Sequence, residues 1–197
     1  MLHDLITGYL APGLKELGFT RSGKSFFRPQ PNWSVIEVQK SVKSTSDRLV
    51  FTINLGIASR RLLSFFSSSA KRPGIAECHW TERIGHLLPE HRDVWWSIDV
   101  GDPVEPLGRS VAEAIVSVGI PHLDQLVTDA ALRDLWLSGV SPGLTEVQRL
   151  MNLSAMLGMI GPGEQLDPVT NELLRVSEGH VTRPMVSAHL RKLSQLA

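Results

Sequence analysis

An alternation of apolar and polar residues between Leu49 and Ile57 constrains the fold of this chain more than any other feature. Successive side chains of a β-strand point to opposite faces of its sheet, so the segment predicts a strand with one apolar and one polar face. A similar segment runs from Trp33 to Val42, and residues 44–47 between the two have the composition of a hairpin connection. The sequence therefore predicts an antiparallel sheet that packs on the rest of the protein through one face.

Helical patterns flank these two segments. Apolar residues recur at helical spacing from Leu2 to Leu17, which predicts a first helix that bends at Pro12 and is closed by Gly18. From Val104 onward, helical spacing prevails. The early and late parts of the chain therefore differ in secondary structure.

Two further strands are expected at residues 26–28 and 95–100. Strands gathered early and helices gathered late are typical of α+β proteins. We expect an antiparallel sheet of about four to five strands packed on helices, with an all-helical C-terminal region. We divide the chain into an α+β body, residues 1–138, and a helical extension packed on it, residues 139–197.

Charge and cysteine content narrow the classes of partner. The 197 residues contain 20 Lys and Arg against 20 Asp and Glu, so no net charge draws the chain toward nucleic acid or an anionic membrane. Cys78 is the single cysteine, which is typical of a reducing compartment. Neither a signal peptide nor an apolar run long enough to cross a membrane is recognisable. We therefore expect a cytoplasmic protein with no membrane contact.

The residues from Gly18 to Ser25 match the phosphate-binding pattern G-x-x-x-x-G-K-S. Phosphate binding needs this loop between a buried strand and the start of a helix, where backbone N–H groups face the phosphates. Here a predicted helix precedes the loop, and the segment from Phe26 to Pro29 after it resembles a strand cut short by proline. We therefore interpret the match as accidental and expect no nucleotide cofactor.

Four potential metal ligands, Cys78, His79, His86 and His91, fall within a short span. Their spacing matches no usual zinc pattern, and Cys78 and His79, as neighbours on a strand, would point to opposite faces. We therefore expect no metal. The sequence also lacks the motifs of nucleophile-elbow hydrolases, zinc proteases, dinucleotide-binding proteins and EF-hands, so no catalytic residue is assigned.

The polar face of the predicted sheet is the strongest candidate for a binding surface. When the apolar residues of each strand pack inward, polar side chains of neighbouring strands come together, with tryptophans at their flanks. The candidate residues are Trp33, Glu37, Gln39, Thr52, Asn54, Trp95 and Asp99. Aromatic side chains beside a few polar groups are typical of recognition surfaces. A solvated face without a binding role is the alternative, since antiparallel sheets commonly expose one face.

The segment from Val181 to Leu193 is similar to the recognition helix of bacterial winged-helix regulators. The side chains that would meet DNA in such a helix are Arg183, Ser187, Arg191 and Lys192. The preceding helical segment, residues 172–176, lies too far upstream for the usual tight turn, and the chain has no net positive charge. An amphipathic C-terminal helix with a buried apolar stripe is the alternative.

A longer pattern in the first two thirds of the chain has a known counterpart. It consists of Leu17-Gly18-Phe19, Phe26-Phe27-Arg28, Val38-Gln39-Lys40-Ser41, Phe51-Thr52-Ile53-Asn54-Leu55-Gly56, Cys78-His79-Trp80, Arg83-Ile84-Gly85 and Trp95-Trp96. This pattern, over about residues 5–130, resembles a bacterial domain-of-unknown-function family, the one numbered 4304. The resemblance implies a small cytoplasmic α+β protein without a known activity, and it transfers no catalytic residue.

Three functions follow as hypotheses, and we favour the first. It is a non-enzymatic protein-binding module, of which an immunity or neutralising protein directed at another protein is the most concrete version. The second is a DNA-binding regulator that uses the C-terminal segment. The third is a hydrolase that uses Glu37, His79 or Asp99. We expect the partner to be another protein rather than nucleic acid.

Overall fold

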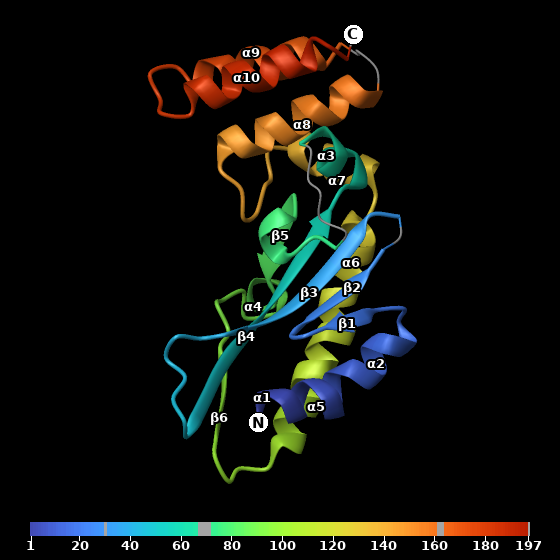
Figure 1. Cartoon of the computed structure of the whole chain (residues 1–197), viewed down its shortest axis with the longest axis vertical. Helices are drawn as coiled ribbons and strands as arrows, with labels where there is room; N and C mark the ends of the chain where they lie inside the picture. Colours follow the sequence, from blue (N-terminus) through green and yellow to red (C-terminus); the bar gives the residue numbers. More distant parts are fainter. Residues whose placement is uncertain (30, 67–71, 161–163, 197) are drawn as a thin grey trace.

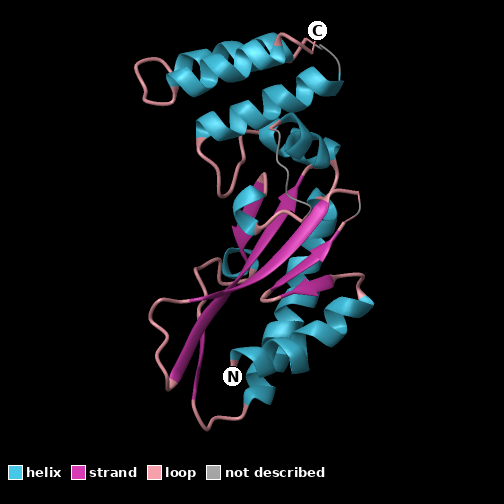
Figure 2. Ribbon diagram, in the orientation of Figure 1, coloured by secondary structure: helices cyan, strands magenta, loops and turns pink. Residues whose placement is uncertain are grey.

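The computed structural model describes residues 1–29, 31–66, 72–160 and 164–196 of the chain (Figure 1). Within these ranges the protein is an α+β fold, as the sequence predicts, with one antiparallel sheet and a helical C-terminal region. Figure 2 shows helices behind the sheet and a second group of helices stacked beyond one of its ends.

The sheet contains six strands, one more than the upper end of the predicted range. They are β1 (Thr20–Ser22), β2 (Ser25–Arg28), β3 (Trp33–Lys40), β4 (Arg48–Ala58), β5 (Trp80–Arg83) and β6 (Trp96–Asp99). The strand order in the sheet is β1-β2-β3-β4-β5. The last strand, β6, lies on the same edge of β4 as β5: β6 pairs with the first half of β4 and β5 with its second half. The sequence did not predict β1 and β5, because segments this short show no alternation.

Helices cover one face of the sheet and extend the molecule beyond it (Figure 1). Those of the body are α1 (Leu2–Leu5), η1 (Ile6–Leu10), α2 (Ala11–Glu16), α3 (Arg60–Phe65), η2 (Ile75–Glu77), α4 (Ile84–Leu87), α5 (Val104–Ala114), η3 (Ile115–Gly119), α6 (Ile120–Leu126) and α7 (Asp129–Leu137). Those of the C-terminal region are α8 (Glu146–Ile160), α9 (Leu166–Val176) and α10 (Arg183–Leu193).

Proline shapes two of the helical runs. The predicted first helix is continuous from Leu2 to Glu16, but its middle is the π-helical turn η1, which ends just before Pro12. The π-helical turn η3 stands in the same relation to Pro121. Proline has no N–H group, and its ring displaces the carbonyl four residues earlier, so a wider turn accommodates it.

Gly18 closes the first helix as expected, with a positive φ of 82°. The Phe19 N–H group donates to the Leu14 carbonyl at 2.9 Å, and the Gly18 N–H group donates to the Lys15 carbonyl at 3.0 Å. These are the two bonds of a Schellman motif, and Leu14 and Phe19 are both buried beside it. The chain then enters β1, so the match to the phosphate-binding pattern lies between a helix end and a β-hairpin.

The main core lies between the sheet and the helices. Phe51, Ile53 and Leu55 of β4 are fully buried, and Ile36 and Val38 lie opposite Leu55 and Ile53 on β3, as the alternation predicts. The same cluster of buried residues continues into the C-terminal helices through Leu150, Met156, Leu173, Val186 and Leu193. Apolar packing therefore runs without a break from the sheet to the C-terminal region.

A second, smaller apolar cluster lies on the opposite face of the sheet, at one end. Its buried members are Phe27, Val35, Ala58, Leu63 and Cys78. The chain around η2 crosses the sheet there because β4 carries Gly56, where an added Cβ would lie 2.6 Å from the Cys78 Sγ atom. Glycine inside a strand commonly marks such a close approach, and here it brings Ile75 and Ala76 over the sheet face.

Candidate functional site

A row of polar residues crosses four strands on this second face. Ser25 of β2 lies opposite Glu37 of β3, Glu37 lies opposite Asn54 of β4, and Asn54 lies opposite Arg83 of β5. The predicted placement of Glu37 and Asn54 on one face is therefore confirmed. Arg83 was not among the predicted residues, because its strand was not predicted.

An open pocket of about 470 Å³ lies over part of this row. It is lined by Gln39, Asn54, Ile75, Ala76, Thr81, Glu82, Arg83, His86 and Gly143. Its floor comes from β3 and β4, its apolar wall from η2, and its polar wall from β5 and α4. Pockets of this size that combine an apolar wall with a few polar groups are typical of ligand sites.

Two amides on the pocket floor hold each other in place. The Asn54 Nδ2 group donates a hydrogen bond of 2.8 Å to the Gln39 Oε1 atom. This bond leaves the Gln39 NH₂ group and the Asn54 carbonyl oxygen available for other partners. If the oxygen and nitrogen positions of both amides are exchanged, the pair still has one NH₂ group and one carbonyl oxygen left. A donor and an acceptor therefore lie side by side in either arrangement.

Arg83 is held at the edge of the pocket by two neighbours. Its Nη1 atom lies 2.6 Å from the Asp93 carboxylate, and its guanidinium lies 5.0 Å from the centre of the Trp95 ring. The Trp95 indole N–H group donates to the same carboxylate at 2.9 Å. The predicted residue Trp95 is therefore half-buried beside the pocket, in a cation–π contact that fixes the arginine.

The other charged groups near the pocket are also paired. The His86 Nδ1 atom lies 2.7 Å from the Glu82 carboxylate, and the Lys24 ammonium lies 3.7 Å from the Glu37 carboxylate. The groups that remain free to bind a ligand are therefore uncharged donors and acceptors.

Three of the predicted residues lie away from the pocket. Thr52 is fully buried, and its hydroxyl donates to the Val94 carbonyl at 2.8 Å. Because the side chain is not exposed, it cannot contact a partner as we expected. Trp33 lies beside the second apolar cluster, with the Arg60 guanidinium 4.9 Å from its ring centre. The third, Asp99, lies at the end of β6, opposite Arg48 of β4.

Glu37 and Asp99, the two carboxylates of the hydrolase hypothesis, lie too far apart to act together in acid–base chemistry. Glu37 lies opposite Asn54 and Asp99 lies opposite Arg48, which places them at positions of β4 six residues apart. At about 3.3 Å per residue this separation is roughly 20 Å. The exposed Asp99 carboxylate instead lies 3.8 Å from the Arg48 guanidinium.

His79, the third residue of the hydrolase hypothesis, belongs to a buried polar network. Its Nδ1 atom accepts a 3.1 Å hydrogen bond from the Ser59 N–H group. Burial lowers the pKa of His79 from 6.5 to about 4, against a smaller opposing effect of the Asp129 carboxylate. The Asp129 carboxylate in turn accepts hydrogen bonds of 2.8 Å from the Ser59 hydroxyl and from the Asn32 amide. The network joins β4, α3 and α7, and Glu37 and Asp99 do not belong to it.

The other cysteine and histidine candidates are also separated. Cys78 is buried, its Sγ atom lies 3.4 Å from the Gly74 carbonyl as a donor, and burial raises the pKa of its thiol. His91 is exposed, and its Nδ1 atom lies 3.0 Å from the His86 carbonyl. In the described part of the chain, no group of three or more His, Cys, Asp or Glu side chains could hold a metal ion.

Two of the four candidate DNA-contacting side chains have partners inside the protein. Arg183 donates to the Leu174 carbonyl at 2.7 Å and to the Ser177 hydroxyl at 3.1 Å, which ties the start of α10 to the end of α9. Lys192 donates to the Phe65 carbonyl and so ties α10 to α3. Ser187 is half-buried and Arg191 is exposed.

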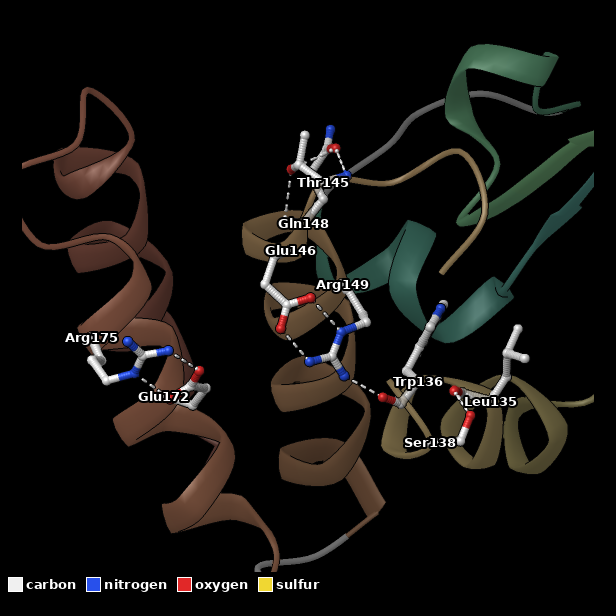
Figure 3. Close-up of polar contacts among 9 residues, drawn as sticks. All are labelled: Leu135, Trp136, Ser138, Thr145, Glu146, Gln148, Arg149, Glu172 and Arg175. Carbon is white, nitrogen blue, oxygen red and sulfur yellow. Dashed lines mark hydrogen bonds and ion pairs between the residues drawn. The ribbon is translucent and has the colours of Figure 1, made fainter. Parts of the chain in front are cut away.

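A buried arginine that the sequence did not single out joins α7 to α8 (Figure 3). The Arg149 Nε atom lies 2.8 Å from the Glu146 carboxylate, and its Nη1 atom donates to the Trp136 carbonyl. The hydrogen bonds between them raise the pKa of Arg149 and lower the pKa of Glu146. On the facing helix, Arg175 and Glu172 form an exposed pair at 2.6 Å. The three-residue spacing of Glu146 and Arg149 is visible in the sequence, but the sequence does not indicate that Arg149 also contacts the Trp136 carbonyl of α7.

The first two thirds of the chain match a family of known sequences. The model of the family described as a domain of unknown function, DUF4304, matches residues 10–125, which is more than half of the chain. No curated protein and no solved structure matches. No helix in the described ranges is long and apolar enough to cross a membrane.

Proposed function

Because this chain belongs to the DUF4304 family, whose function is unknown, we propose a function from its geometry: a non-enzymatic protein-binding module. Its contact surface is the open pocket together with the neighbouring Arg83 and Trp95. The most concrete version is an immunity or neutralising protein that binds another protein. The single cysteine, Cys78, supports a cytoplasmic setting.

The observation that carries this proposal is the pair of Arg83 and Trp95 beside the pocket. Tryptophan and arginine are over-represented among the residues that dominate binding energy at protein interfaces. Here the two side chains are immobilised by Asp93 before any partner arrives, so binding costs little side-chain entropy.

The two other functions have less support. The DNA-binding hypothesis would depend mainly on the exposed Arg191, because Arg183 and Lys192 have internal partners. The hydrolase hypothesis needs several of Glu37, His79 and Asp99 to converge in one site, whereas these residues are spread along β4 and its neighbouring segments. The protein-binding hypothesis uses groups that lie together on one surface.

The proposal is tested by affinity capture from a lysate of the cells that produce the protein, with and without nuclease. The tagged wild-type chain is compared with Arg83→Ala and with the control Arg109→Ala, which removes an exposed arginine from α5. We expect one stoichiometric protein that survives nuclease, is retained by Arg109→Ala and is lost with Arg83→Ala. Equal capture by all three chains, or capture of nucleic acid alone, would refute the proposed surface.

A further inference from the structure

We infer that the pocket binds an extended, uncharged peptide segment of the partner protein and that Gln39 and Asn54 contact the main-chain N–H and C=O groups of one residue of that segment. This inference rests on the proposed protein-binding function and specifies its chemistry. Three features of the pocket support it: the orientation of the two amides, the partners of the carboxylates and the apolar wall.

The orientation of the Gln39 and Asn54 amides favours one extended residue of a peptide as the ligand. A residue in extended conformation directs its own N–H and C=O groups to the same side, as in the hydrogen-bonded pairs of an antiparallel ladder. The Gln39–Asn54 pair offers one donor and one acceptor side by side, which is the complement of that residue. Because each amide fixes the other, little orientational freedom is lost on binding.

The charges around the pocket favour an uncharged segment. The Asp93 and Glu37 carboxylates are paired with Arg83 and Lys24, and the Glu82 carboxylate contacts the Nδ1 atom of His86. A charged ligand would have to displace one of these partners, whereas a neutral one can use the free donors and acceptors. Binding should therefore depend little on ionic strength, since screening acts on net charge interactions.

The apolar wall favours a peptide over an isolated amide group. Ile75 and Ala76 lie beside the polar floor, where the side chain next to the contacted residue of the peptide can pack against them. Alternate side chains of an extended peptide point to opposite sides, so one enters the pocket while the next faces solvent. The inferred ligand is thus an extended segment with a small apolar or uncharged residue next to the residue whose main chain is contacted.

A library of displayed heptapeptides, selected on the full-length protein, supplies the probes. The selected peptides are synthesised and their affinities measured at two salt concentrations tenfold apart, for wild type, Asn54→Leu and the control Lys40→Ala. Lys40 is exposed and adjoins Gln39 on β3, but it points to the opposite face. We expect the affinity of the selected peptides to change less than about twofold between the two salt concentrations. Lys40→Ala should bind them as tightly as the wild type, and Asn54→Leu should bind them more weakly.

Replacement of each peptide amide in turn by an ester then identifies the contacted residue. An ester lacks the N–H donor, so replacement of the amide on the N-terminal side of that residue should lower the affinity of the wild type about fivefold to tenfold. The same ester should cost Asn54→Leu less than about twofold, because the contact is already missing. Tolerance of esters at every position, strong salt dependence, or selection of no peptide would overturn the inference. If affinity capture still yields a partner that Arg83→Ala loses, the proposed protein-binding function is supported and only the inference of a peptide ligand is refuted.

Discussion

Acid should destabilise this protein through one buried histidine, and the size of the effect follows from the structure. His79 accepts the Ser59 N–H group through Nδ1, and burial lowers the pKa of His79 from 6.5 to about 4. In the unfolded chain His79 regains its ordinary pKa, so the unfolded state takes up a proton first as the pH falls. The folded state therefore loses stability between about pH 6.5 and about pH 4, and neutral pH leaves it unaffected.

The magnitude is about 1.4 kcal/mol for each pH unit inside this window, because one unit of pKa difference corresponds to that free energy. Between about pH 7 and about pH 5 the free energy of unfolding should fall by roughly 2 kcal/mol through His79 alone. His189 contributes in the same direction, since burial and the nearby Lys192 lower its pKa to about 4. Other groups contribute too, so the His79 term has to be isolated by subtraction.

The assay compares wild type with His79→Asn, whose side-chain carbonyl can accept the Ser59 N–H group without titrating in this range. Urea unfolding is followed at several pH values for both proteins, and the difference in unfolding free energy is plotted against pH. We expect wild type to lose about 2 kcal/mol relative to the variant between about pH 7 and about pH 5. A constant difference would refute the lowered pKa, and a difference of opposite slope would show that Asp129 dominates over burial.

Three further predictions concern packing and the phosphate-binding pattern. Gly56→Ala should destabilise the protein by about 1–3 kcal/mol, because the added methyl group would overlap Cys78, whereas Gly13→Ala on an open helix surface should stabilise it slightly; thermal denaturation of both checks this. Arg149→Ala should cost about 1–2 kcal/mol in urea unfolding, since it removes the hydrogen bond to the Trp136 carbonyl that ties α8 to α7. Lys24→Ala should leave ATP binding as undetectable as in wild type by calorimetry, because Lys24 lies in a hairpin turn between two strands.

Local patterns predicted the parts of the fold that depend on neighbours in sequence. The alternation around Phe51 and Asn54 gave the correct faces of β4, and the glycine after Leu17 gave the correct helix end. The pocket depends on contacts between distant segments, and so does the burial of Thr52 beneath Val94. One signal was available in the sequence: a glycine at position 56, inside a strongly apolar strand, indicates that another segment approaches closely.

The eleven-residue strand β4 joins the two halves of the sheet, with β3 on one edge and β5 and β6 on the other. A shift of β4 by one residue would exchange its two faces, which would expose Phe51 and bury Asn54 at the same time. Core packing and the proposed peptide contact of Asn54 are therefore set by the same register. Backbone amides of β4 should accordingly exchange with solvent only when the whole domain opens, and mutations can retune the pocket through Ile75, Thr81 or His86, in the segments that surround it, without disturbing that register.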